Sequence, residues 1–501
     1  MNYLMVPGNS EPLFSEGFLP VSEVQKTSCD LLVPEDAVNF FSLFNGKGPA
    51  QLRAMQKKFS CTGAYQLQID EKGISVFAGD PEGFRYAANR LKILLLEAKS
   101  SFAKEWNGTG PITGSGRLQF QDISDAPLLP MRGMHFYLPA MRHLSFKDLL
   151  NLLDAMAKWN MNTVIFEYEN RFPFRKHRVI KAPGAFSVKE IQKLLSHAAG
   201  LGLQVIPLHQ SLGHVNHILR HSAYASLREE EVAMDQWCPL NPDSFSLFKE
   251  LLDQILDLHG SLPYLHIGGD ETRRLGQCEK CAEKVRKEGA GKLYTDYMNM
   301  VISYVRSLGM TPILWDDMLC RHSETFNDLS RDAVLMYWDY WTVANPSAMF
   351  VARPAGKGQA ADKRWRDLWR GELDPVERSM LDTFGHYLDF ETELSQHFLR
   401  KFAPYLGSEF PKRIKAFPYL EYYMDHGFRV ICAGASSANH TQWRGLSDYP
   451  RFAENLFTFG ERAGESGSMG LISTNWYPMP VEAYFAGVVF AGQASWGCKN
   501  P

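Results

Sequence analysis

Short apolar runs alternate with amphipathic segments through the last three quarters of the chain. Eight runs have the length and the flanking turn residues of buried strands, at residues 131–138, 162–169, 204–210, 264–271, 311–317, 333–340, 429–437 and 470–477. Each of the first seven is followed by a segment with apolar residues at helical spacing, and Ser187 with Glu190 forms a capping box before one of these segments. Eight strands that alternate with helices predict an α/β fold, a (β/α)8 TIM barrel.

A different pattern precedes the barrel. Residues 64–70 and 73–78 predict two strands around a turn, residues 81–99 a helix, and residues 117–122 a further strand. Prolines at positions 127 and 130 mark a linker. We therefore expect a small α+β domain over residues 1–125 and the barrel domain over residues 126–501.

One connection within the barrel is too long to be a simple loop. Residues 345–425 follow the sixth predicted strand and contain helical patterns at 366–373 and 391–402. We expect a helical insertion in the barrel at this place.

Composition and charge exclude several classes of partner. The 501 residues include 53 Lys and Arg against 56 Asp and Glu, which gives a formal net charge of −3. Such a chain has no overall positive field to attract nucleic acid or an anionic membrane, and no run approaches the ~20 apolar residues of a membrane span. The first residues lack the basic start and apolar run of a signal peptide, so we expect a cytoplasmic protein. No feature of the sequence sets the oligomeric state.

The eight cysteines are scattered, and Cys278 and Cys281 are the pair that lies close together. Scattered cysteines in a chain of this length fit reduced thiols better than a disulfide framework. A Cys-x-x-Cys pair without a second such pair is an incomplete structural zinc site.

Ionisable and aromatic side chains collect at the predicted carboxyl ends of the strands, where the active site of such a barrel lies. These residues are Glu167, Glu169, His209, His214, Asp270, Glu271, Trp315, Trp338, Tyr340 and Trp476. Carboxylates, imidazoles and indoles that converge on one mouth favour acid/base chemistry on a neutral ligand with apolar faces. A sugar fits that description.

The strongest single motif is His-Ile-Gly-Gly-Asp-Glu at residues 266–271. Two glycines after a buried strand let the backbone approach a ligand closely. Two adjacent carboxylates, Asp270 and Glu271, repel each other, so that one takes a proton more readily than the other. Such a pair supplies a general acid beside an ionised partner, although an isolated Asp-Glu pair in a Gly-rich turn is ordinarily two solvated acids.

This motif resembles the His-x-Gly-(Gly/Ala/Cys)-Asp-Glu signature of glycoside hydrolase family 20, the β-N-acetylhexosaminidases. Residues 166–169, 205–230 and 315–318 resemble the hexosaminidase D-like branch of that family. Arg132-Gly133 matches the family's Arg-Gly, and the N-terminal unit resembles the α+β domain that commonly precedes the family's barrel.

The resemblance implies a retaining exo-β-N-acetylhexosaminidase that removes terminal β-linked GlcNAc or GalNAc from a small glycan or glycoconjugate. The family's reaction is substrate-assisted: the 2-acetamido oxygen attacks the anomeric carbon and forms an oxazolinium ion. Glu271 would be the general acid and then the base, and Asp270 would orient the acetamido group. The resemblance implies no metal and no organic cofactor.

Other roles are implied for residues that match the family less closely. Arg132 would bind the O3 and O4 hydroxyls, with a salt bridge at the barrel bottom as its alternative, and His214 would orient the acid site. Trp315, Trp338 and Trp476 would wall the acetamido pocket and floor the sugar. One of Glu167 and Glu169, which are typical of the hexosaminidase D-like branch, would bind a sugar hydroxyl, or both would form ion pairs with Arg171 or Arg175.

The chain also departs from the usual family pattern. Residues 136–138 (Phe-Tyr-Leu) stand where Leu-Asp is usual, and Gln210 replaces the usual Asp of strand three. Residues 433–437 offer no match for the strand-seven Tyr that steadies the acetamido oxygen, and Tyr340 is the substitute candidate.

Three other functions fit parts of the pattern. A metal-dependent barrel hydrolase would use His209, His214, His217 and Asp270. A retaining glycosidase with two carboxylates would use Asp316 or Asp317 as its nucleophile. A catalytically silent glycan-binding barrel would need neither, but the intact Asp270-Glu271 pair argues against it.

Overall fold

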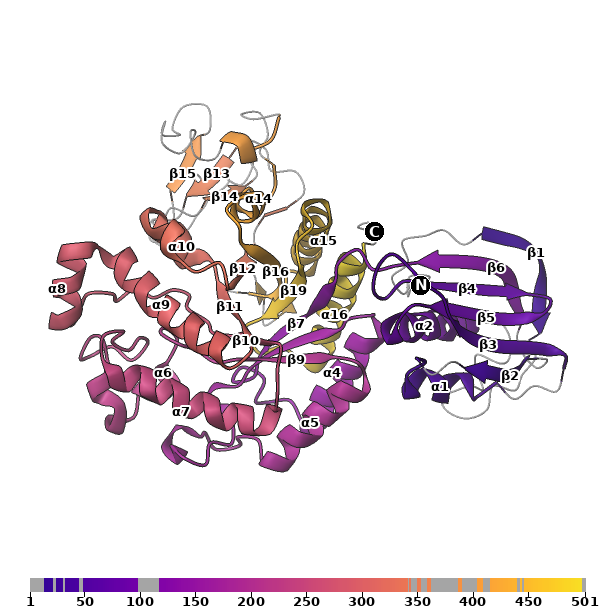
Figure 1. The fold of residues 1–501 in the computed structure, drawn as a ribbon, viewed down its shortest axis with the longest axis horizontal. Helices are drawn as coiled ribbons and strands as arrows, with labels where there is room; N and C mark the ends of the chain where they lie inside the picture. The colour runs from indigo at the N-terminus through magenta and orange to yellow at the C-terminus, as the bar shows by residue number, and fades with distance from the viewer. Residues whose placement is uncertain are drawn as a thin grey trace.

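The computed structural model describes residues 13–20, 24–29, 32–44, 48–97, 117–340, 342–343, 349–352, 358–361, 386–389, 403–408, 415–438, 442–443 and 446–497. Figure 1 shows two units: a barrel surrounded by helices, and a smaller sheet domain beside it. The helix α2 (Pro81–Glu97) lies between the two.

Eight parallel strands close into a barrel, as the alternating apolar runs predict. In spatial order they are β10 (Tyr264–His266), β11 (Thr311–Trp315), β12 (Val334–Trp338), β16 (Arg429–Ser437), β19 (Gly470–Asn475), β7 (Met131–Tyr137), β8 (Thr163–Glu167) and β9 (Gln204–Leu208). Each contains the apolar centre of one predicted run, but six of them stop short of the polar residues at its end. Those polar residues therefore lie in the loops at the mouth of the barrel.

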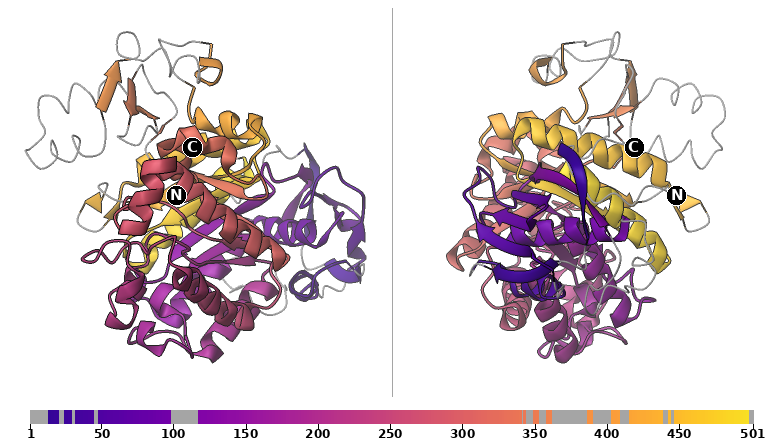
Figure 2. Two further views of the ribbon diagram at one scale, coloured as in Figure 1. Left: turned by 60° about the vertical axis from the view of Figure 1, so that its left-hand side comes forward. Right: turned by 90° about the vertical axis from the view of Figure 1, so that its right-hand side faces the viewer.

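Helices cover the outside of this barrel (Figures 1 and 2). They are α4 (Phe146–Lys158), α5 (Val188–Gly200), α6 (Asn216–Leu219), α7 (Pro242–His259), α8 (Glu279–Glu288), α9 (Ala290–Ser307), α10 (Asp317–Arg321), α14 (Tyr419–Asp425), α15 (Tyr449–Ser466) and α16 (Val481–Trp496). Ser145 begins α4 and Ser187 begins α5, each with a complete capping box. The caps fix the point at which each loop from the mouth turns into a helix.

Two apolar clusters divide the barrel into an inside and an outside. Residues of alternate strand positions, such as Val164 and Leu314, pack against the helices. The other face of the strands fills the lumen, where Ile313 and Trp315 of β11 and Trp338 of β12 belong to one cluster. The lumen is therefore a packed core that becomes aromatic towards the carboxyl ends of the strands.

The N-terminal domain is a six-stranded mixed sheet with two helices. Its strand order is β1-β6-β4-β5-β3-β2, formed by Leu13–Pro20, Arg117–Asp125, Tyr65–Asp70, Gly73–Ala78, Ala50–Gln56 and Val24–Cys29, and its helices are α1 (Glu35–Phe41) and α2. The pattern of the sequence predicts β4, β5, β6 and α2. It does not predict β1, β2, β3 and α1. Their segments lack clear runs of strand residues with turn residues between them.

The Arg132 side chain joins the two domains at the bottom of the barrel, the end opposite the mouth. It is the second residue of β7 and is 1% exposed. Its guanidinium donates to the carbonyls of Leu129, Pro130 and Asn160 and to the hydroxyl of Tyr86 in α2. The structure therefore contradicts the assignment of Arg132 to the sugar hydroxyls and agrees with the alternative, a salt bridge at the barrel bottom, since Arg132 Nη2 lies 3.4 Å from the Glu82 carboxylate.

Replacing Arg132 with alanine should reduce stability without changing substrate affinity. The substitution leaves the buried carbonyls of Leu129 and Asn160 without their charged donor, so we expect a loss of about 3–5 kcal/mol. Urea unfolding would measure the loss, and Arg175→Ala, at an exposed ion pair with Asp257, is the matched control. If Arg132→Ala raised KM tenfold and left the unfolding midpoint unchanged, Arg132 would have to contact the substrate, and its structural role would be refuted.

The insertion after β12 differs from the expected helical segment where it is described. Three short strands, β13 (Met349–Ala352), β14 (Gly358–Ala361) and β15 (His386–Asp389), form an antiparallel sheet in the order β14-β13-β15. The helix α14 follows near its end. The predicted helical patterns at 366–373 and 391–402 lie outside the described residues.

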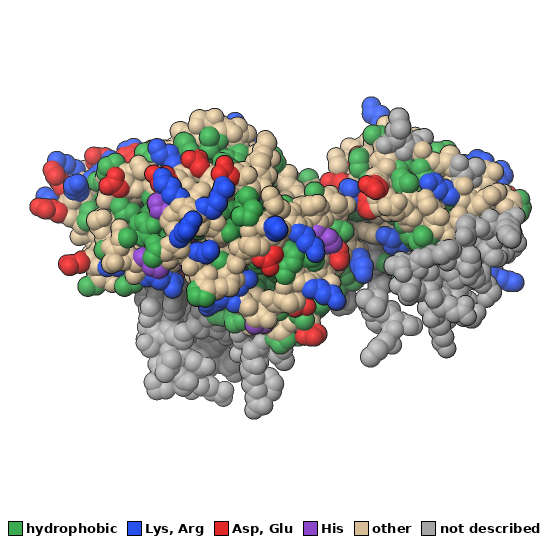
Figure 3. Space-filling view, turned by 90° about the horizontal axis from the view of Figure 1, so that it is seen from below, with side chains coloured by type: hydrophobic (Ala, Val, Ile, Leu, Met, Phe, Trp, Pro, Cys, Tyr) green, Lys and Arg blue, Asp and Glu red, His purple; other side chains and the backbone are tan. Residues whose placement is uncertain are grey.

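The surface carries charges of both signs. Figure 3 shows two lobes joined by a narrower waist, with Lys and Arg side chains interspersed among Asp, Glu and hydrophobic ones. This mixture agrees with the net charge of −3. Among the helices that the structure describes, none is long and apolar enough to cross a membrane.

Candidate active site

The loop after β10 carries the Gly-Gly-Asp-Glu part of the motif. Gly268 and Gly269 have φ of 65° and 88°, a region that favours glycine. A Cβ on Gly268 would lie 1.8 Å from Gln210 Oε1, and one on Gly269 would lie 2.8 Å from the Met298 side chain. Both glycines are therefore required for the backbone to turn so closely against its neighbours.

This turn places two carboxylates around one imidazole. His214 Nε2 lies 3.2 Å from Asp270 Oδ2 and 3.6 Å from Glu271 Oε2. The charge of Asp270, and that of Glu271 to a smaller extent, raises the pKa of His214 to about 10. His214 is therefore a cation at neutral pH. The Asp270 side chain is 13% exposed and that of Glu271 35%, so Glu271 is the more accessible acid.

Three residues of the mouth have left-handed backbone conformations. Glu169, His214 and Glu271 have φ of 43°, 53° and 47°, and they are half of the six non-glycine residues with positive φ among those described. Each such residue costs about 1–3 kcal/mol, and strain of this kind clusters at functional sites. The surrounding contacts must therefore hold these three side chains in place.

The two carboxylates after β11 are engaged by the protein. Asp316 Oδ1 accepts a hydrogen bond from the backbone N–H of Trp338 at 3.1 Å, and Asp316 Oδ2 accepts one from the Tyr423 hydroxyl at 2.7 Å. Asp317 Oδ2 accepts the Glu271 N–H at 3.0 Å, and burial with the charges of Asp270 and Asp316 raises the Asp317 pKa to about 7. Both carboxylates are hydrogen-bonded within the protein, whereas the nucleophile of a two-carboxylate mechanism needs an oxygen that is free to attack.

The aromatic residues singled out in the sequence lie together. The rings of Trp315 and Trp476 are 5.9 Å apart, and those of Trp338 and Tyr340 are 5.3 Å apart. Trp476 Nε1 donates to the Tyr340 hydroxyl at 3.0 Å, and Trp338 Nε1 lies 3.4 Å from Asp317. These contacts join the four rings to the loop that holds the acid pair.

Glu167 lies within the same site but is buried. Its carboxylate lies 3.2 Å from His135 Nε2 and accepts a bond from Gln210 Nε2 at 2.9 Å. The His135 ring is 4.6 Å from the Trp476 ring. Glu167 therefore links β7, β8 and β9 beneath the aromatic residues.

Glu169 lies in a different environment. It accepts a bond from the Tyr137 hydroxyl at 3.2 Å and lies 3.7 Å from His217 Nδ1. Burial, with the charge of Glu167 adding to it, raises the Glu169 pKa to about 8. Glu169 is therefore mostly protonated at neutral pH and can donate a hydrogen bond.

The expected ion pairs of these glutamates with Arg171 or Arg175 do not form. Arg175 pairs with Asp257 at 3.1 Å, and the Arg171 guanidinium stacks 4.5 Å from the Phe186 ring. Arg175 therefore lies against α7, and Arg171 lies against the loop that leads into α5.

The histidines of the metal-dependent alternative are separated. His209 bonds the Phe248 carbonyl of α7 at 3.2 Å and stacks on the Phe248 ring, and burial lowers its pKa to about 4. His217 lies by Glu169, whereas His214 lies by Asp270. These residues contact three different partners, so they do not offer one ion a common set of ligands.

The structure thus places Arg132 at the barrel bottom and His209 against α7, and it brings together the remaining candidates: Glu167, Glu169, His214, Asp270, Glu271, Trp315, Trp338, Tyr340 and Trp476. Sequence reasoning missed His135 and Arg273. His135 is a polar residue on the lumen face of β7, and this signal was available from strand alternation. Arg273, two residues after Glu271, donates to its carboxylate at 2.7 Å.

Comparisons with known proteins agree with this geometry. Residues 167–353 match the model of glycosyl hydrolase family 20, catalytic domain. The chain is 40% identical to hexosaminidase D of Homo sapiens over 212 residues, 40% of this chain and 40% of that protein. It is 35% identical to hexosaminidase D of Bos taurus over 187 residues, 36% of this chain and 54% of that protein. The matches span about half the length of these relatives or less.

Solved structures share the fold over nearly the whole chain. The β-N-acetylhexosaminidase of Bacteroides fragilis aligns with a TM-score of 0.63 at 16% identity, over 99% of this chain and 91% of that one. The family 20 exo-β-N-acetylglucosaminidase of Vibrio harveyi aligns with a TM-score of 0.65 at 16% identity, over 98% and 73%. The domain model, the relatives and the acid pair at the mouth of the barrel agree, and residues 167–353 are similar to the catalytic domain of glycosyl hydrolase family 20.

Proposed function

We propose that this protein is a retaining exo-β-N-acetylhexosaminidase that removes terminal β-linked GlcNAc or GalNAc by substrate-assisted catalysis. One observation carries the proposal: Asp270 is held beside cationic His214 while Glu271, next to it, is more open to solvent. The names of the hexosaminidase D relatives favour the same substrate class.

Glu271 acts as the general acid. As the acetamido oxygen forms a bond to the anomeric carbon, the bond to the leaving oxygen breaks, and that oxygen takes the proton of Glu271. An incoming water then attacks the anomeric carbon of the oxazolinium ion, the bond from that carbon to the acetamido oxygen breaks, and the water gives its proton to Glu271. Two inversions at one carbon leave its configuration retained.

Asp270 orients the acetamido group. Its Oδ1 is buried and receives no hydrogen bond from the described residues, so it is free to accept the acetamido N–H. The carboxylate of Asp270, which lies 3.2 Å from His214 Nε2, would offset the positive charge of the oxazolinium ion. Trp315, Trp338, Tyr340 and Trp476 supply apolar walls for the sugar.

The proposal predicts that the 2-acetamido group is required for hydrolysis. Aryl β-N-acetylhexosaminides should be cleaved, and the matching β-hexosides without that group should react at least about 10³-fold more slowly, because they lack the nucleophile. A panel of aryl glycosides that differ only at C2 and C4 measures this ratio and the gluco- or galacto-preference. Equal rates with and without the acetamido group would refute substrate assistance.

A further inference from the structure

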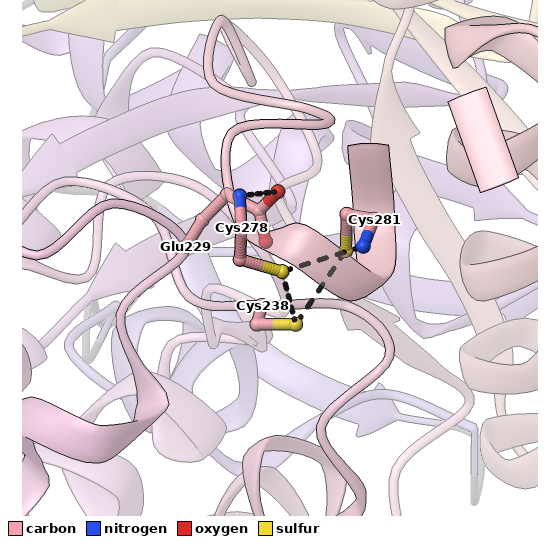
Figure 4. Close-up of side chains that lie close together, drawn as sticks. All are labelled: Glu229, Cys238, Cys278 and Cys281. Carbon is pink, nitrogen blue, oxygen red and sulfur yellow. Dashed lines mark hydrogen bonds between the residues drawn. The ribbon is translucent and has the colours of Figure 1, made fainter. Parts of the chain in front are cut away.

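A second cluster of reactive side chains lies outside the acid site. Cys238, Cys278, Cys281 and Glu229 place three sulfur atoms and a carboxylate oxygen within 4.8 Å of one another (Figure 4). Cys238 Sγ is 3.5 Å from each of the other two sulfurs. All three cysteines are free thiols.

The cluster joins residues from two loops. Cys278 is the residue before α8, where its sulfur accepts the Cys281 N–H, so the Cys-x-x-Cys pair faces one side of the first turn. Cys238 comes from the long loop between β9 and α7, where its N–H bonds the Leu227 carbonyl. Because Cys238 is 40 residues before Cys278, no local spacing reveals it.

Glu229 is the most unusual member of the cluster. The residue is 1% exposed, and its Oε1 accepts the backbone N–H groups of Gly276, Gln277 and Cys278. Its Oε2 is buried and has no hydrogen-bond partner among the described residues, and no described Lys, Arg or His pairs with the carboxylate. Burying a carboxylate without a nearby cation costs free energy. The cluster therefore lacks the positive charge that would offset this cost.

We propose that Cys238, Cys278, Cys281 and Glu229 bind one structural Zn²⁺ ion. Tetrahedral ligands about 2.3 Å from zinc are roughly 3.8 Å apart, close to the sulfur separations of 3.5 Å. Three thiolates and one carboxylate fill a closed tetrahedral shell, which is typical of structural rather than catalytic zinc. A disulfide would join two of the sulfurs and leave the third cysteine and Glu229 unexplained.

The ion would fix the two loops that carry the acid site. The loop from β9 to α7 holds His214, and the loop from β10 to α8 holds Asp270 and Glu271. The same loops are already joined by Arg274, which bonds Asp235 at 2.6 Å and also pairs with Glu230. Zinc adds a crosslink near the helix ends of both loops. It would hold Asp270 and Glu271 in position and would take no part in the reaction.

The native protein itself provides the first test. Full-length protein purified under reducing conditions and dialysed against metal-free buffer should contain about one zinc per chain. After removal of zinc with a chelator, Co²⁺ should give the visible bands of a tetrahedral site and strong sulfur-to-cobalt charge transfer. Protein that contains no zinc and gives no such spectrum, or that is two hydrogen atoms lighter because of a disulfide, would overturn the proposal.

Variants identify the ligands. Cys281→Ser should lose the zinc, and Cys238→Ser should lower the charge-transfer absorption by about a third. Glu229→Gln should keep that absorption and weaken zinc binding at least about tenfold.

Cys61→Ser, at an exposed thiol, and Cys432→Ser, at a buried one, are the controls and should keep a full complement of zinc. Equal zinc content in Cys281→Ser and the native protein would exclude the site; if a variant fails to fold, the native cobalt spectrum decides.

Discussion

Replacing Glu271 with glutamine should lower kcat on unactivated N-acetyl-β-hexosaminides by about 10²–10⁴-fold, because the leaving oxygen then receives no proton. The glutamine keeps the size of the side chain and can occupy the same left-handed backbone position (φ 47°). The main-chain bond from Glu271 N–H to Asp317 is also retained. The loss would therefore report the missing proton and not a displaced loop.

The leaving group separates this role from a general loss of structure. Aryl glycosides with very acidic leaving groups need little protonation, so Glu271→Gln should be much closer to the native enzyme on them. Glu231→Gln, the same change at an exposed residue of a neighbouring loop, is the control and should retain native rates. If Glu271→Gln lost the same factor on every leaving group, Glu271 would not be the general acid.

Replacing Asp270 with asparagine should lower kcat by about 10²–10³-fold, since the oxazolinium ion loses its oriented carboxylate. The expected loss covers all leaving groups, because the acetamido group must form its bond in every case. Asp257→Asn, at an exposed ion pair, is the control. A rate within about threefold of the native enzyme would refute the assigned role of Asp270.

The same variant should change the titration of His214. The charge of Asp270 is the largest cause of the raised His214 pKa, so Asp270→Asn should lower that pKa from about 10. A raised histidine pKa stabilises the folded state fully below about pH 6.5, and the stabilisation is lost as the pH rises towards 10. In the variant this decline in stability should be smaller. NMR titration of the histidine ring protons and unfolding midpoints across that range measure both effects.

The barrel could be predicted from the sequence because its strands are buried on both faces. Apolar runs such as residues 131–138 and 429–437 stand out from the amphipathic helices between them. The strands β1, β2 and β3 belong to a small mixed sheet and lack such runs, so their pairing depends on partners distant in sequence. Most predicted strands also extend a few residues beyond the observed strand ends. These extra residues are polar or aromatic, and they lie in the loops at the mouth of the barrel.

The site could be predicted where its residues follow strand ends, as Asp270, Glu271 and Trp315 do. Arg132 was misplaced because a motif was given more weight than position: the second residue of a barrel strand lies at the bottom. Cys238 and Glu229 could not be found, since their nearness to Cys278 depends on the path of a loop that no local pattern encodes.

The contact of Trp496 with the N-terminal domain has a consequence for synthesis. Trp496 is fully buried in the apolar core of that domain and donates to Asp125, 371 residues earlier in the chain. At roughly 5–20 residues per second, the ribosome needs about 20–75 s to make the intervening chain. The N-terminal sheet domain must therefore wait with part of its apolar core uncovered while the 371 intervening residues are made, and it completes its core together with the barrel.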